Sequence, residues 1–60
     1  MKLWLVLYIA ARLWAAVPYD GSMVACMSDA GAIAAKVAAS PDPAAQSAKA
    51  DCVYRKRRPQ

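Results

Sequence analysis

The largest apolar side chains of this chain lie in its first 17 residues, and this segment limits what the rest can fold into. Residues 3–17 hold all of the leucine and both tryptophans, behind the single charge of Lys2. The remainder is rich in alanine, which contributes little when buried. A chain of 60 residues buries only about 60% of its unfolded surface. The sequence therefore predicts at most one small domain, which needs a covalent link, a membrane or a partner to stay folded.

Three interpretations of residues 1–17 are open. One positive charge before a long apolar run is typical of a secretory signal peptide, although no cleavage site with small residues at both −3 and −1 follows. As an uncleaved membrane anchor, Leu3–Val17 forms a helix of about 22 Å, shorter than the hydrocarbon core of about 30 Å. The third interpretation is a helix packed into a larger assembly. Three aromatic residues suit a membrane interface: Trp4, Tyr8 and Trp14.

The most regular helical pattern follows the turn at 18–22. From Ser22 to Ala39, apolar residues recur at steps of three and four and so share one face. Asp20 or Ser22 is a suitable N-cap. The prolines at 41 and 43 end this helix, and the pair Asp42–Pro43 starts a short second one over 44–50.

Residues 52–55 favour an extended strand. The predicted fold class is therefore small and mostly α. It has an apolar N-terminal helix near 3–16, an amphipathic helix over 22–39, and an extended C-terminal segment tied back by one disulfide. The chain divides into a signal peptide, anchor or packing helix at 1–17, a helical miniprotein at 18–54, and a basic tail at 55–60.

The two cysteines, Cys26 and Cys52, are predicted to form a disulfide. They are too far apart for a Cys-x-x-Cys redox motif, and no histidine or further cysteine completes a zinc site. Behind an export-like leader, two cysteines in so small a chain indicate a covalent link worth about 3.5 kcal/mol of chain entropy. The alternatives are two separate buried thiols, or lipidation of Cys26 in a lipobox-like segment, Met23–Cys26.

The composition argues against an enzyme. Histidine and glutamate are absent, so the usual general bases are missing and the serines have no catalytic partner. The sequence predicts no catalytic residue, no metal site and no cofactor.

The basic run of Arg55, Lys56, Arg57 and Arg58 supplies the net charge of +4. Such a run binds an anionic membrane surface or the phosphates of nucleic acid, or else is a solvated tail without a partner. Export and nucleic-acid binding are incompatible unless the chain travels inside a particle.

The order of motifs resembles short exported proteins encoded in phage and prophage genomes. It comprises a Met-Lys-Leu-Trp-Leu-Val-Leu-Tyr leader, Pro-Tyr-Asp before a helix with one cysteine, Asp-Cys-Val-Tyr-Arg, and an Arg-Arg-Pro end. The resemblance implies a role in the virion or envelope.

The expected function is non-enzymatic: an exported or membrane-associated protein that binds a partner protein or an envelope surface. The alternatives are a structural component of a phage particle or membrane complex, and nucleic-acid contact through the tail. The expected location is the periplasm, envelope or extracellular space, with virion or membrane as the alternative.

Overall fold

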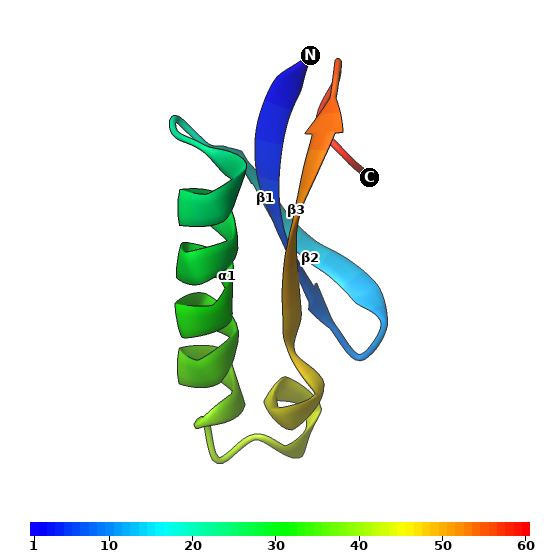
Figure 1. The fold of residues 1–60 in the computed structure, drawn as a ribbon. Coiled ribbons are helices and arrows are strands. Elements are labelled where there is room, and N and C mark those ends of the chain that lie inside the picture. The colour runs from blue at the N-terminus through cyan, green and yellow to red at the C-terminus, as the bar shows by residue number, and fades with distance from the viewer.

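The computed structural model describes residues 1–60 and contains one sheet and one long helix (Figure 1). The elements in chain order are β1 (Lys2–Ile9), β2 (Arg12–Pro18), α1 (Met23–Ala38), the 3-10 helix η1 (Pro43–Ser47) and β3 (Lys49–Arg55). The strands form an antiparallel sheet in the order β2–β1–β3, so the first strand is the central one. Helix α1 packs on one side of this sheet against β3 and β1, and it does not contact β2.

The predicted mostly-α fold class is wrong. Residues 3–16, predicted as an apolar helix, form most of a β-hairpin, and strand content (37%) slightly exceeds helix content (35%). The second helix predicted over 44–50 is a single 3-10 element, and residue 49 already belongs to β3. The helix predicted over 22–39 is confirmed as α1, with the Ser22 side chain accepting a hydrogen bond from the Ala25 N–H. The extended character at 52–55 is confirmed within β3.

Strand β1 is apolar and buried from Leu3 to Leu7 because side chains cover both of its faces. Leu3 and Leu5 point toward α1, whereas Trp4 and Val6 belong to a separate cluster on the opposite face. A strand buried on both sides has no alternation of polar and apolar residues, and a short run of this kind resembles a buried helix. The available signal was the placement of the leucines at every second position, 3, 5 and 7, with Trp4 and Val6 between them.

The hairpin turn is made by two alanines in the left-handed region. Ala10 and Ala11 have φ values of 53° and 63°. Two-residue hairpin turns require positive φ and normally use Asn-Gly or Asp-Gly, so the sequence carries no turn signal here. One hydrogen bond supports the turn from outside, since the Ala10 N–H donates to the Ser47 Oγ of η1 (3.0 Å).

Replacing Ala10→Asn and Ala11→Gly together is expected to raise the free energy of unfolding by about 1–2 kcal/mol. The reason is that alanine in the left-handed region is strained by roughly this amount, whereas Asn-Gly suits the turn. The matched control places the same pair in α1, as Ala34→Asn with Ala35→Gly, where it is expected to destabilise by about 1 kcal/mol or more. Urea unfolding followed by circular dichroism measures both. Destabilisation by the first pair would favour a helix over residues 3–16.

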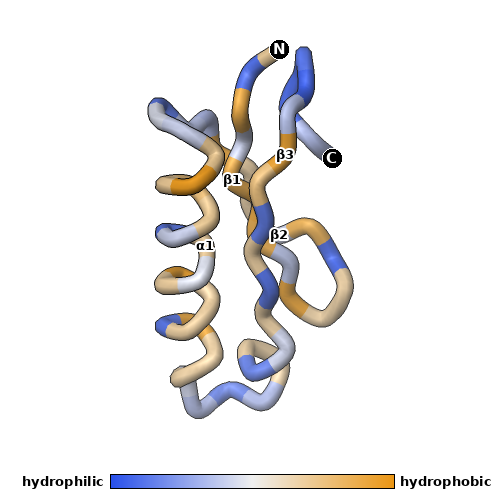
Figure 2. Tube along the Cα trace, viewed as in Figure 1, coloured by the Kyte–Doolittle hydropathy of each residue, from blue (hydrophilic) through white to orange (hydrophobic).

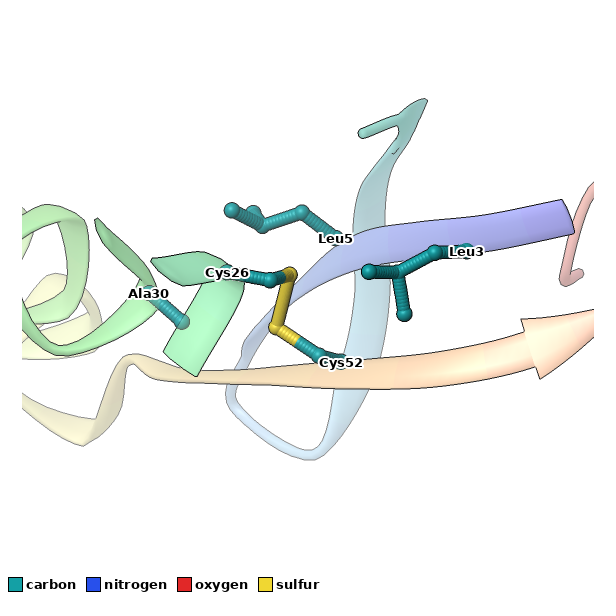
Figure 3. Packing of buried hydrophobic residues seen from close by; sticks show 5 residues of the cluster. All are labelled: Leu3, Leu5, Cys26, Ala30 and Cys52. Carbon is teal, nitrogen blue, oxygen red and sulfur yellow. A yellow bond between two sulfur atoms is a disulfide. The ribbon is translucent and has the colours of Figure 1, made fainter. Parts of the chain in front are cut away.

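The core between α1 and the sheet is organised around the disulfide. Cys26 in α1 and Cys52 in β3 are bonded, which confirms the predicted disulfide, and both are buried. The sulfur atoms lie between Leu3 and Leu5 of the sheet and Ala30 of the helix (Figure 3). The small side chains of Cys26 and Ala30 allow the helix to approach the leucines closely. Because both sulfur atoms are used in this bond, neither two separate thiols nor a lipid anchor on Cys26 is compatible with the fold.

Candidate functional site

One face of the sheet carries no helix, and it is called the open face below. Strand register assigns side chains to it, because directly paired residues in an antiparallel sheet point the same way. Its central row is Lys2, Trp4, Val6 and Tyr8 of β1. The flanking positions are Leu13, Ala16 and Pro18 of β2, and Lys49, Asp51, Val53 and Arg55 of β3. In Figure 1, α1 lies on one side of the sheet and the C-terminal end turns toward the other.

The centre of the open face is apolar and closely packed. Trp4, Val6 and Ala16 are buried there, and the partly buried Leu13 and Val53 pack against them. Val6 is fully buried although no helix covers it, so the side chains of this face cover one another. The exposed residues of the open face surround this packed centre: Lys2, Tyr8, Pro18, Lys49, Asp51 and Arg55.

Charge is divided unequally between the two layers of the molecule. The strands and residues 56–58 hold seven of the eight Lys and Arg residues and a single acid, Asp51. The segment from Tyr19 to Ala48, which contains α1 and η1, holds the other three acids and only Lys36. The sheet layer is thus strongly positive and the helix layer weakly negative. A field of this kind attracts anionic partners to one side of the protein.

The basic tail predicted from the sequence lies beside the N-terminus. Arg55 ends β3 and pairs with Lys2, so both chain ends meet at the same end of the sheet. Figure 2 shows this end of β3 in hydrophilic colours next to the N-terminus. Arg58 returns over Trp4, with its Cζ atom 5.9 Å from the ring centroid, while Lys56 and Arg57 are exposed. The predicted contact residues therefore do not all project together, because Arg58 packs on the open face.

The three aromatic residues predicted for a membrane interface occupy different environments. Trp4 is only 7% exposed, and its indole N–H donates to the Arg55 carbonyl oxygen (3.2 Å). Tyr8 is partly exposed on the open face, and Trp14 is 72% exposed in β2 beside the irregularity that interrupts the hairpin register. Tyr8 and Trp14 remain available to a surface, whereas Trp4 supports the fold. No helix in the structure has both the length and the apolar character needed to cross a bilayer.

Sequence reasoning did not single out Lys2 or Lys49 as site residues. Both are isolated single charges in the sequence, and only the strand register places Lys2 opposite Arg55 and Lys49 opposite Tyr8. The one weak signal was the alternation in β1, which puts position 2 on the same face as Trp4. No pocket and no group of three metal-ligating side chains is present.

On the helix side, one polar contact links the loop after β2 to α1. The Tyr19 hydroxyl donates a hydrogen bond to Asp29 Oδ2 (2.5 Å), and the Tyr19 N–H donates to the Leu3 carbonyl oxygen. The hydrogen bond to Asp29 raises the pKa of Tyr19, with smaller contributions from desolvation and from the carboxylate's charge. The two hydrogen bonds of Tyr19 link α1 to the central strand.

The pKa of Tyr19 is expected to lie above the ordinary tyrosine value of about 10 in an absorbance titration at alkaline pH. Because the folded pKa is raised, the contribution of this contact to stability is present below the unfolded value of about 10. It is lost as the pH rises through the folded value. Asp29→Asn is expected to return the pKa of Tyr19 toward its ordinary value, whereas the control Asp42→Asn is expected to leave it raised. A pKa of Tyr19 that Asp29→Asn leaves unchanged would contradict the contact.

Comparison of the chain with protein families, with curated proteins and with solved structures gives no match. The resemblance to exported phage and prophage proteins therefore stays a prediction, and the functional argument rests on the open face alone.

Proposed function

We propose that this protein is a non-enzymatic binding protein that attaches to an anionic membrane surface of the cell envelope through the open face and the basic tail. The observation that carries the proposal is the division of charge, which gathers seven of the eight cations in the sheet layer and tail. Each Lys or Arg near an anionic lipid surface contributes about 1 kcal/mol to attraction. The sheet layer can bring several of them to the surface together.

Two further features support a membrane over nucleic acid as the anionic partner. Trp14 and Tyr8 are exposed on the sheet layer, and tryptophan and tyrosine are favoured at the depth of lipid headgroups. The disulfide suits an oxidising compartment, in which lipid surfaces are available and nucleic acid is scarce. Both features agree with an exported protein.

Co-sedimentation with vesicles tests the proposal. The wild-type protein is expected to bind vesicles that contain phosphatidylglycerol and to leave pure phosphatidylcholine vesicles unbound, with binding that weakens as salt rises. Replacing Arg55, Lys56, Arg57 and Arg58 by serine is expected to weaken binding by about a hundredfold or more at low salt. The variant is expected to stay folded, with a loss of about 1 kcal/mol from the Arg58–Trp4 contact.

The matched control changes Arg55, Arg57 and Arg58 to lysine, which preserves the charge and is expected to keep most of the binding. Equal binding to neutral and anionic vesicles, or unchanged binding of the serine variant, would contradict the proposal. Tighter binding to single-stranded DNA than to anionic vesicles at the same salt concentration would contradict the membrane proposal and favour nucleic-acid binding as the function.

A further inference from the structure

Three cations of the sheet layer lie at the same end of the open face. Lys2 and Arg55 are directly paired across β1 and β3, which places two positive side chains opposite each other on the same face. Like charges in this position destabilise an antiparallel pair. Arg58 returns from beyond the end of β3 and adds a third charge beside them.

Trp4 is the centre of this cluster. The Lys2 Nζ atom lies 5.8 Å from the centroid of its ring, and the Arg58 Cζ atom lies 5.9 Å from it. The backbone of Arg55 is tied to the same residue, because its carbonyl oxygen accepts the indole N–H. Attraction of cations to the aromatic ring holds the charges in place. The indole is buried in the sheet, so it provides a fixed base for the side chains of Lys2 and Arg58 and for the backbone of Arg55.

No acidic residue within the cluster balances these charges. The segments 1–19 and 52–60 contain no Asp, and the chain has no Glu. The acid on the same face, Asp51, pairs with Val6 further along the strand, and its carboxylate accepts the Cys52 N–H (2.8 Å). Arg55 uses one N–H donor for the carbonyl oxygen of Tyr54 (2.7 Å), and a guanidinium has five. N–H donors and positive charge therefore remain available to bind an anionic ligand.

We propose that Lys2, Arg55 and Arg58 form an anion site on Trp4 that binds a phosphate group. Two guanidinium groups favour a phosphate, because each can offer paired N–H donors to its oxygen atoms. A bound phosphate relieves the repulsion between Lys2 and Arg55, so binding stabilises the folded state. This inference rests on the proposed function, since it names the chemical group that the protein recognises on the anionic surface. The phosphate belongs either to a lipid headgroup or to a soluble phosphate ester.

Fluorescence of Trp4 reports on the site directly when Trp14→Phe makes it the only tryptophan. In this background, inorganic pyrophosphate at constant ionic strength is expected to change the Trp4 emission saturably and to raise the midpoint of thermal unfolding. Sodium chloride of equal ionic strength is expected to do neither. Vesicles are compared at equal surface charge, one set with phosphatidylglycerol and one with oleate, which carries a carboxylate in place of a phosphodiester. Equal affinity for the two sets would overturn the assignment to phosphate.

A pair of single substitutions distinguishes binding at a local site from attraction by the overall electrostatic field of the protein. Arg58→Ser and Lys36→Ser each remove one positive charge, the first at the cluster and the second in the helix layer. Arg58→Ser is expected to weaken pyrophosphate binding about fivefold, as follows from about 1 kcal/mol per cation, and Lys36→Ser to change it little. An equal loss in both variants would overturn the site.

The same measurements distinguish failure of the site from failure of the proposed function. If the wild-type protein binds phosphatidylglycerol vesicles while pyrophosphate leaves Trp4 unchanged, the membrane function stands and the phosphate site is wrong. If pyrophosphate binds and vesicles do not, the site stands with a soluble ligand and the membrane function is wrong.

Discussion

Reduction of the Cys26–Cys52 disulfide is expected to unfold the protein at room temperature. The bond joins positions 26 residues apart, and opening that loop releases about 3.5 kcal/mol of chain entropy to the unfolded state. A single core in so short a chain rarely supplies more than about 3–5 kcal/mol, so this loss removes most of the stability. It also removes the covalent contact between α1 and β3 at the centre of the helix-side core. Circular dichroism and amide NMR spectra with and without a reductant measure the effect.

A double Cys26→Ala, Cys52→Ala variant controls for side effects of the reductant and is expected to be equally unfolded. Alanine fits the space of a buried cysteine, so the variant tests the covalent bond more than the packing. Retention of dispersed amide resonances by the double variant would show that the sheet and helix are stable without the bond.

Removal of residues 1–16 is expected to abolish the fold completely. This change deletes β1, which pairs with both other strands, and most of β2. Five of the ten buried residues belong to β1: Leu3, Trp4, Leu5, Val6 and Leu7. The remaining chain keeps α1 and β3 joined by the disulfide, with no strand to pair with β3 and no leucine to bury. Its amide NMR spectrum is expected to be that of a disordered chain.

The control for truncation is removal of Pro59 and Gln60, which lie outside every strand and helix, and that variant is expected to fold normally.

The result of removing residues 1–16 bears on the signal-peptide interpretation of residues 1–17. Cleavage after Ala16 in the native host and this sheet are mutually exclusive, so intact mass of the folded protein from the host is expected to include residues 1–16. A folded chain that lacks them would contradict the strand order.

The sequence predicted the elements that depend on local signals. The helix after Ser22 has an N-cap and a regular apolar stripe. The cap at Asp42 with Pro43 next was also predicted, but the helix expected to follow over 44–50 is only a 3-10 element that ends at Ser47. The disulfide followed from composition. The hairpin was missed because the turn at Ala10–Ala11 lacks the residues that usually mark it, and because β1 is covered on both faces.

The candidate site was predicted only in part, because its members meet through strand pairing. The basic tail is visible in the sequence, whereas Lys2 joins it only because β1 and β3 run antiparallel with Lys2 opposite Arg55. Trp4 looked like a residue for a membrane interface, and it is buried because it faces the cluster with Val6 and Ala16. No local pattern reports a contact between two segments so far apart in the chain.

The central position of the first strand also determines when the sheet can form during synthesis. The ribosome releases β1 before β3, and β1 pairs with β3 along nearly its full length. The sheet and the disulfide therefore wait until β3 has been made, while β1 and β2 stay unpaired or form only a hairpin. A two-stranded hairpin alone is marginally stable in water. The nascent chain thus remains unfolded until β3 emerges, which is the state that a secretion channel or a chaperone accepts.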